Sequence, residues 1–204
     1  MLRKNHKRVP MLGNNELDLM TLPRERVSVM PLHTLLNCPY ATVGAIGARW
    51  YMPERKTSDI DLLIPPDECA AARRSLESHG GKKAYALNFL HTTLGLTGER
   101  WHVLGEMPID LLWSDHEWCE SAITEAKRDE LGVWYAPLWA IVVMKRDASR
   151  SRDQGDIANT LGLASDYTLK EVREIGARLL PDQTGDLEEY IYFGRFDVGR
   201  EVDS

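Results

Sequence analysis

The sequence predicts an α+β fold, in which a mixed β-sheet with flanking helices is followed by a C-terminal helical lobe. Two patterns along the chain support this prediction. Short apolar runs divided by glycine and proline fill much of the chain from Tyr40 to Trp113, as is typical of strands. Longer segments with helical character follow Trp113. Strands that precede a block of helices indicate an α+β architecture.

The predicted sheet begins with Ala41 to Ile46, a run of small and β-tolerant residues that ends in a tight turn at Gly47. A short helix over 48–52 is stopped by Pro53, and a second strand over 57–64 is closed by two prolines. Further strands are predicted at 84–89, 91–96, 100–104 and 108–113.

One helix is predicted within the sheet region, over 68–78, with Asp67 as its N-cap. The helices of the C-terminal part are predicted near 115–127, 137–147, 151–163, 168–179 and 185–191. These elements divide the chain into an N-terminal arm over 1–30, a core over 31–115 and a helical lobe over 116–204 that packs on the core.

The composition supports a protein with a real core. Of the 204 residues, 43% are hydrophobic, while the formal charge of -6 argues against an electrostatic grip on nucleic acid by the whole surface. Three widely spaced cysteines do not form a disulfide framework. The chain begins with basic residues rather than an apolar signal segment, and its apolar runs are too short to span a bilayer. We therefore expect a soluble cytoplasmic protein without a membrane partner.

Two aspartates separated by one residue, Asp59 and Asp61, are the first candidate site residues. Alternate side chains of a strand point to one face, so both carboxylates would lie together, with Cα atoms about 6.5–7 Å apart. Unpaired, they raise each other's pKa, whereas a shared divalent cation holds both ionised. Oxygen ligands favour Mg²⁺ or Mn²⁺. The alternative is turn chemistry at Asp59, because this short pattern is common by chance.

A third carboxylate, Asp110, lies in the apolar run from Pro108 to Trp113. An acidic residue in such a strand is costly unless it is paired or faces a site. If this strand lies beside 57–64, the three carboxylates form a cluster able to hold two metals about 3.5–4 Å apart, which suits phosphoryl or nucleotidyl transfer. The alternative is a solvated side chain at a strand end.

The segment from Val43 to Arg49, followed by Arg55-x-Thr57-x-Asp59-Ile60-Asp61-Leu62, resembles the signature of the DNA polymerase β-type nucleotidyltransferase superfamily. That signature is a Gly-Ser or Gly-Gly turn, roughly ten residues, and an acidic-x-acidic strand. Here ten residues separate Ala48 from Asp59. The stretch Arg55-x-Thr57-x-Asp59-Ile60-Asp61-Leu62 is similar to that of bacterial nucleotidyltransferase-like proteins related to AbiEii abortive-infection toxins. A later segment is similar to the Lys-(x)n-Arg-Asp-x-x-Asp stretch of those proteins: Lys145, Arg152, Asp153 and Asp156.

The resemblance implies a nucleotidyltransferase-like fold and nucleotide-binding roles at the turn. Backbone N–H groups at Gly47 and Ala48 would meet the triphosphate, with Arg49 in support. Thr57 and Ser58 are the nucleotide-binding candidates that precede the acidic strand. Because Ala48 stands where the family has Ser or Gly, no hydroxyl is available there, and a positive φ would be strained. This departure keeps open a catalytically degenerate protein that binds a nucleotide or a protein partner.

The resemblance also implies the catalytic and metal-binding residues, which are Asp59, Asp61 and Asp110. Asp110 would bind one metal and help to deprotonate the acceptor hydroxyl, and Lys145 would meet the phosphates as a point charge. The possible supporting residues are Arg152, Asp153 and Asp156. The alternatives are a helix lysine that extends to solvent and a surface ion pair between Arg152 and Asp153.

The predicted function is therefore a Mg²⁺- or Mn²⁺-dependent transferase that moves a nucleoside monophosphate from an NTP to a hydroxyl, with pyrophosphate leaving. The acceptor is an RNA 3′ end, a protein or a small molecule. The toxin-like resemblance implies tRNA or protein acceptors and an antitoxin partner. A plain structural domain is the remaining alternative, and it requires Asp110 to lie far from Asp59 and Asp61.

Overall fold

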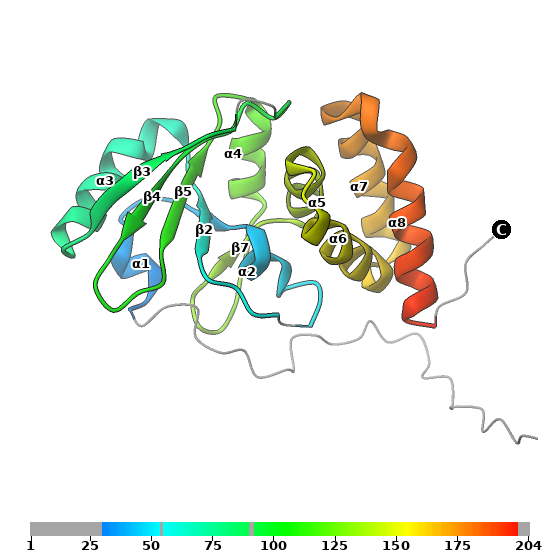
Figure 1. Cartoon of the computed structure of the whole chain (residues 1–204), viewed down its shortest axis with the longest axis horizontal. Helices are drawn as coiled ribbons and strands as arrows, with labels where there is room; N and C mark the ends of the chain where they lie inside the picture. The colour runs from blue at the N-terminus through cyan, green and yellow to red at the C-terminus, as the bar shows by residue number, and fades with distance from the viewer. Residues whose placement is uncertain (1–29, 54, 90–91, 200–204) are drawn as a thin grey trace, which may run out of the picture.

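The computed structural model describes residues 30–53, 55–89 and 92–199, so the predicted N-terminal arm lies outside the described residues except for Met30. A mixed sheet with strand order β3-β4-β5-β2-β1-β7-β6 forms one part of the molecule, and helices α5 to α8 form a lobe to one side of it (Figure 1). The predicted α+β fold with a C-terminal helical lobe is confirmed.

The strands are β1 (Ala41–Thr42), β2 (Ile60–Leu63), β3 (Lys82–Leu87), β4 (Thr97–His102), β5 (Ile109–Trp113), β6 (Lys127–Arg128) and β7 (Trp134–Tyr135). The pairs β2–β5 and β1–β7 are parallel, and the other neighbours are antiparallel. The sheet therefore continues beyond residue 115, since β6 and β7 extend it past β1.

The helices are α1 (Leu32–Leu35), α2 (Gly44–Ala48), α3 (Cys69–Ser78), α4 (Glu117–Thr124), α5 (Leu138–Ala148), α6 (Ser151–Leu163), α7 (Asp166–Leu179) and α8 (Thr184–Asp197). Short 3-10 turns cover Pro66–Glu68 and Pro181–Gln183. The predicted N-cap Asp67 lies inside the first of these turns, and α3 begins at Cys69 without a side-chain cap. Ser165 does cap α7, since its hydroxyl accepts a hydrogen bond from the Thr168 N–H.

The predicted strand over 41–46 is wrong beyond Thr42. Gly44 has φ +63°, which a side chain rarely tolerates, and it turns the chain directly into α2. The Val43 N–H donates to the carbonyl of Asp61, so the turn is fixed against β2. The helix expected at 48–52 therefore starts four residues earlier.

The predicted strand at 91–96 is also wrong over its described residues, 92–96, which form no strand and turn at 93 and 94, where side chains hold the backbone. The carboxylate of Asp147 on α5 accepts hydrogen bonds from the Thr93 and Leu94 N–H groups, at 2.8 and 2.9 Å. The Leu94 carbonyl accepts from the Ser114 hydroxyl and the Trp118 indole. Backbone groups paired in this way have no need of a strand partner.

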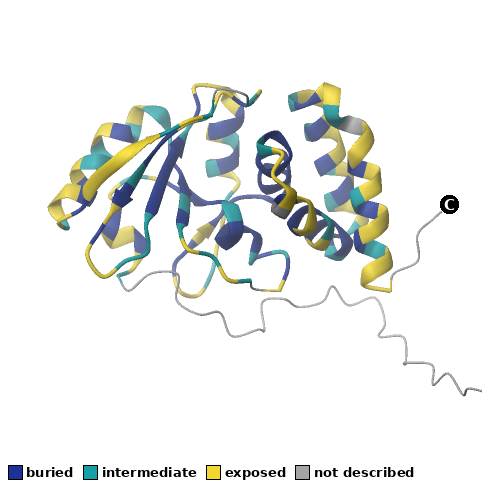
Figure 2. Cartoon of the chain, viewed as in Figure 1, coloured by how far each residue is buried: buried dark blue, intermediate teal, exposed yellow. Residues whose placement is uncertain are grey.

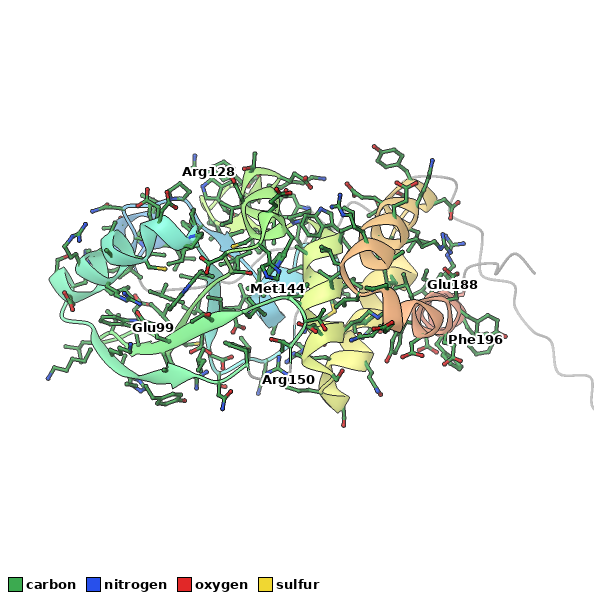
Figure 3. All side chains as sticks on the ribbon, turned by 90° about the horizontal axis from the view of Figure 1, so that it is seen from above. Glu99, Arg128, Met144, Arg150, Glu188 and Phe196 are labelled. Atoms are coloured by element: carbon green, nitrogen blue, oxygen red, sulfur yellow. The ribbon has the colours of Figure 1, made fainter. Side chains whose placement is uncertain are left out.

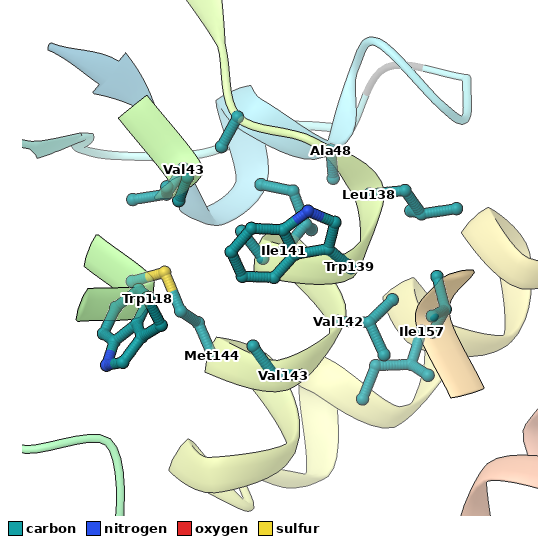
Figure 4. Packing of buried hydrophobic residues seen from close by; sticks show 14 of the residues in the cluster. Val43, Ala48, Trp118, Leu138, Trp139, Ile141, Val142, Val143, Met144 and Ile157 are labelled. Atoms are coloured by element: carbon teal, nitrogen blue, oxygen red, sulfur yellow. The ribbon is translucent and has the colours of Figure 1, made fainter. Parts of the chain in front are cut away.

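Strand alternation gives the sheet two buried faces. Ile60 and Leu62 pack with Ile109 and Leu111 in a cluster that also contains α3 residues, whereas Leu63 belongs to the cluster of the helical lobe. Figure 2 shows α5 as a largely buried helix between the sheet and the rest of the lobe, and Figure 4 shows how its apolar side chains pack. The lobe is thus fixed on one face of the sheet, where the candidate site lies.

Among the described residues, no helix combines the length and the apolar character needed to cross a bilayer.

Candidate active site

Four polar side chains form a row across four neighbouring strands. Asp61 on β2 is paired with Asp110 on β5, Asp110 with Arg100 on β4, and Arg100 with Tyr85 on β3. Directly paired residues project from the same face of a sheet. Asp59 lies two residues before Asp61, and its carboxylate joins the same group through Arg100. The structure therefore brings the three predicted carboxylates together.

The guanidinium of Arg100 binds two of these carboxylates. Its Nε and Nη2 donate to the two oxygens of Asp110 at 2.6 and 2.7 Å, and Nη2 also donates to Asp59 Oδ2 at 2.8 Å. The pKa of Arg100 is raised above its ordinary value, and the largest cause is the pair of hydrogen bonds to Asp110. Thr57 donates to the other oxygen of Asp59 at 3.0 Å. Asp59 and Asp110 are thus held by a cation of the protein itself.

Asp61 lies beside this arrangement without a counter-ion. Among the described residues, its carboxylate has no hydrogen-bond or ion-pair partner. Burial above all, together with the charges of Asp59 and Asp110, raises the pKa of Asp61 to about 7 against weaker opposing effects of Arg150 and Lys145. A carboxyl group in this state is ready to bind either a proton or a cation at neutral pH.

The donor set fits a hard divalent cation, because it consists of three carboxylates on one face of a sheet. As the side chains stand, no group of three or more His, Cys, Asp and Glu residues in the described part of the chain is arranged around a metal position. The reason is Arg100, which draws Asp59 and Asp110 onto its guanidinium. Metal binding by all three carboxylates therefore requires Arg100 to release at least one of them.

The turn that approaches the carboxylates is at Gly44 rather than at Gly47. Gly44 and Ala45 line the cavity described below, whereas Gly47 and Ala48 are buried within α2 and do not. A Cβ on Gly47 would lie 2.5 Å from the Thr42 carbonyl, so this glycine allows α2 to pack closely. Arg49 follows α2 and also lies outside the cavity lining. The strained φ expected at Ala48 is absent, since the positive φ belongs to Gly44.

Replacing Gly44 with alanine is expected to damage the site severely. The new Cβ would lie 1.9 Å from Asp61 Oδ2 on a backbone with φ +63°, so Asp61 or the turn must move. We expect a loss of about 2–4 kcal/mol in unfolding free energy by urea denaturation, and loss of divalent metal binding. Gly155→Ala on α6 is the matched control, because its Cβ meets nothing within 4 Å and should leave stability equal or higher. Equal behaviour of the two variants would contradict the role of Gly44.

A cavity of about 620 Å³ opens over the row of carboxylates, between the sheet and the helical lobe. One part of its wall is apolar, and another part is cationic. The apolar side chains are Val43, Ala45, Leu87, Phe89, Leu96, Leu112, Met144 and Ala148. The cationic side chains are Arg55, Lys56, Arg100, Lys145 and Arg150. Figure 3 places Met144 and Arg150 at the junction of the sheet and the lobe.

Lys145 is buried and bound to two carboxylates of α6. Its Nζ donates to Asp153 at 3.1 Å and to Asp156 at 2.6 Å. Arg55 adds a bidentate pair to Asp156, and Arg150 binds the second oxygen of Asp153. Burial alone would raise the pKa of Asp156, but the hydrogen bonds from Arg55 and Lys145 lower it below its usual value. Lys145 is therefore a fixed charge at the cavity wall rather than a lysine that extends to solvent.

The other sequence-predicted residues divide between the cavity and the interior. Thr57, Ser58 and Asp153 line the cavity, whereas Asp156 lies behind Lys145 and does not. The backbone of Arg152 belongs to α6, but its side chain lies outside the described residues.

Two residues of the site, Arg55 and Arg100, were not predicted from the sequence. A sequence signal existed for the first but not for the second. Arg55 stands in the motif that carries the resemblance, so its position was visible although its partner Asp156 was not. Arg100 follows no motif. Only the register of β4 on β5 reveals that it faces Asp110.

The fold and site define an α+β protein with a three-carboxylate cavity beside a helical lobe. No family model matches the chain, and no curated protein matches it. Two solved structures of the antibiotic-resistance factor ANT(2'')-Ia are similar to it. One is a solution structure with 18% identity and a TM-score of 0.42, covering 82% of this chain and 91% of that one. The other is a crystal structure in complex with adenylyl-2''-tobramycin, with 17% identity and a TM-score of 0.43, covering 82% and 96%.

Proposed function

We propose that this protein is a divalent-metal-dependent nucleotidyltransferase that moves a nucleoside monophosphate from an NTP to a hydroxyl acceptor. The observation that carries the proposal is the row of Asp61, Asp110 and Arg100 on one sheet face, with Asp59 beside it. These carboxylates lie at the base of a cavity whose opposite wall supplies fixed cations, including Lys145. Carboxylates for metal on one side and cations for phosphate on the other are what nucleotidyl transfer requires.

The residues that would hold the metal are Asp59, Asp61 and Asp110. When bound, the metal would neutralise charge on the triphosphate and favour ionisation of the attacking hydroxyl. The acceptor oxygen attacks the α-phosphorus, the bond from that phosphorus to the bridging oxygen breaks, and pyrophosphate leaves. In the proposed mechanism, a carboxylate oxygen of Asp110, released by Arg100, accepts the hydroxyl proton.

The cations bound to the carboxylates of α6 are suited to hold the triphosphate in place. Arg55 and Arg150 are partly exposed and each is bound to one carboxylate of α6, while Lys145 lies between those carboxylates. Such ion pairs fix the direction of each charge before a ligand arrives, which lowers the ordering cost of binding. In this proposal Asp153 and Asp156 position the cations and do not touch the reacting atoms.

The acceptor that the cavity fits best is a small hydroxyl compound. A cavity of about 620 Å³ lies within the usual range for small-molecule sites, and its apolar wall offers a surface for a flat ring. An RNA 3′ end or a protein hydroxyl would need further surface outside the cavity. The proposed toxin-like role and the antitoxin partner rest on the AbiEii-like resemblance alone.

The test of this function is a transfer assay with labelled NTPs, Mg²⁺ and fractionated small-molecule and RNA acceptors. The matched control is the Asp59→Ala/Asp61→Ala double variant, which keeps the helical lobe and its cations intact. We expect a labelled product only with the unchanged protein and only in the presence of Mg²⁺ or Mn²⁺. Identical labelling by the two proteins would exclude the transfer.

A second candidate function, nucleotide binding without turnover, is favoured by one observation. Arg100 already binds both Asp59 and Asp110, so these two carboxylates are held in place without a metal. Calorimetry separates the two functions: Mg²⁺-dependent NTP binding without transfer to any tested acceptor supports the non-catalytic protein.

Replacing Arg100 with glutamine is expected to weaken the metal-free protein and to strengthen metal binding. Loss of the guanidinium leaves Asp110 and Asp59 without their cation, which should lower the unfolding free energy by about 2–3 kcal/mol. Released carboxylates should bind Mn²⁺ roughly tenfold more tightly, as measured by calorimetry. Arg73→Gln is the control, since Arg73 pairs with Glu99, which neighbours Arg100 on β4 and projects from the opposite face of the sheet. If Mn²⁺ affinity falls in Arg100→Gln, Arg100 does not compete with the metal.

A further inference from the structure

A second, smaller cavity of about 250 Å³ lies within the helical lobe. Its wall comes from the end of α5, the start of α6 and the start of α8. The residues that line it are Lys145, Arg146, Ser149, Arg150, Asp153, Gln154, Ile157, Gln183, Asp186 and Tyr190. Three of them, Lys145, Arg150 and Asp153, also line the main cavity, so the two cavities share a wall.

Arg146 is the unusual member of this wall. It is 5% exposed, and its Nη1 and Nη2 atoms are buried without a hydrogen-bond partner among the described residues. Its guanidinium reaches across the lobe, because a Cβ on Gly176 of α7 would lie 4.0 Å from Nη1. Burial lowers the pKa of Arg146, against smaller opposing effects of Asp186 and Tyr190. A buried guanidinium in this state is costly unless an anion completes it.

The charges around the smaller cavity leave Arg146 uncompensated. Asp153 is already shared by Lys145 and Arg150, whose nitrogens lie 3.1 and 2.7 Å from its oxygens. Asp186 faces Arg146 and offsets part of its charge, but the two form no ion pair within the described residues. The remaining polar lining residues are neutral: Ser149, Gln154, Gln183 and Tyr190. The cavity therefore combines an excess of positive charge with neutral hydrogen-bond donors.

We propose that this cavity is an oxyanion site, in which Arg146 binds a phosphate group that is either free or carried as a monoester. The planar fork of a guanidinium matches two phosphate oxygens, and the amides of Gln154 and Gln183 and the hydroxyl of Tyr190 supply further donors. The site is separate from the row of carboxylates on the sheet and does not depend on nucleotidyl transfer. Its shared wall with the main cavity means that a bound phosphate adjoins Lys145 and Arg150.

The test is thermal unfolding of the full chain in increasing inorganic phosphate, with ionic strength held constant by chloride. A ligand that binds only the folded state raises the unfolding temperature in proportion to its occupancy. We expect a phosphate-dependent rise for the unchanged protein and none for Arg146→Met. Arg55→Met removes a cation that lines the main cavity but not the smaller one, and it should keep the rise, which excludes phosphate bound to Arg55 as its cause. Glycerol phosphate in place of phosphate tells a monoester site from a site for the free ion.

A further variant, Asp186→Asn, allows the proposal to be tested even if Arg146→Met does not fold. If the cavity binds phosphate, removing the opposing carboxylate should tighten binding severalfold. If Arg146 is instead the partner of Asp186, this variant should lose stability in chloride and gain no phosphate response. That result, or an equal phosphate response in Arg146→Met and the unchanged protein, would overturn the proposal.

Discussion

Replacing Asp61 with asparagine is expected to abolish metal-dependent nucleotidyl transfer and to make the metal-free protein more stable. Asp61 is one of the three carboxylates proposed to bind the metal, so its removal should lower the rate of the proposed transfer by at least about 10³-fold. The same carboxylate is partly buried beside Asp59 and Asp110 without a counter-ion among the described residues, so its charge opposes folding. An amide of the same shape removes that charge, and the unfolding free energy should rise by roughly 2–4 kcal/mol at pH 8.

The pH dependence of this effect has a definite sign. The pKa of Asp61 is raised from 3.8 to about 7 in the folded protein, so between these values the folded state holds a proton that the unfolded state has lost. The contribution of Asp61 to stability therefore falls as pH rises from about 4 to about 7, and it changes little above that. Asp61→Asn lacks this dependence. The two proteins should be similar in stability near pH 4 and should diverge towards pH 8.

Urea denaturation from pH 5 to pH 8 in the presence of a chelator measures this difference. Asp67→Asn is the matched control, because it makes the same change at an exposed aspartate. It should change the unfolding free energy by less than about 0.5 kcal/mol. Mg²⁺ should stabilise the unchanged protein more at pH 8 than at pH 6, since binding must displace the Asp61 proton at the lower pH. A loss of stability in Asp61→Asn at pH 8 would show that the carboxylate is already neutralised.

The carboxylate row shows what a sequence can reveal of this site. The alternation of a strand places Asp59 and Asp61 on one face, and an acid inside an apolar strand indicates that Asp110 faces a site. Both inferences use rules that act within a few residues. The register that sets Asp61 opposite Asp110, and Arg100 opposite Asp110, depends on contacts between distant segments. Arg100 could therefore not be predicted from the sequence, although it forms ion pairs with both Asp59 and Asp110.

The helices and strands likewise divide into those that a local sequence pattern predicts and those that depend on contacts between distant segments. The helix predicted at 151–163 agrees with α6, because a long periodic pattern with its own start and stop is a local property. Strands of two residues such as β6 and β7 have no such pattern and exist only through their pairing. The turn at Gly44 was misplaced by three residues because Val43-Gly44-Ala45 and Ile46-Gly47-Ala48 have the same form. The two are distinguished by tertiary structure, since Gly44 has a positive φ beside Asp61 whereas Gly47 packs on the Thr42 carbonyl and Ile141.

Replacing Lys145 with methionine is expected to destabilise the protein more than the other helical-lobe substitutions considered above. Methionine keeps the apolar length of the side chain, but the buried carboxylates of Asp153 and Asp156 lose their shared cation. Breaking such a buried pair should lower the unfolding free energy by about 3–5 kcal/mol. Lys170→Met is the control, because its pair with Glu174 is exposed and should contribute less than about 0.5 kcal/mol. Urea denaturation of both variants at neutral pH measures the difference.

The double variant Lys145→Met/Asp156→Asn separates the lost charge from lost packing. In Lys145→Met, Arg55 and Arg150 still bind Asp156 and Asp153, so the cost arises from the positive charge lost between the two carboxylates. Neutralising Asp156 should then restore at least half of the stability. The pKa of Asp156, which is lowered when Lys145 and Arg55 bind it, gives a second measure. Its contribution to stability is present at neutral pH and is lost as pH falls through the lowered pKa, so Lys145→Met should flatten the acid side of the stability curve. A double variant no more stable than Lys145→Met would mean that Lys145 supports the lobe by packing, and the fixed cation proposed for the triphosphate would then lack its structural basis.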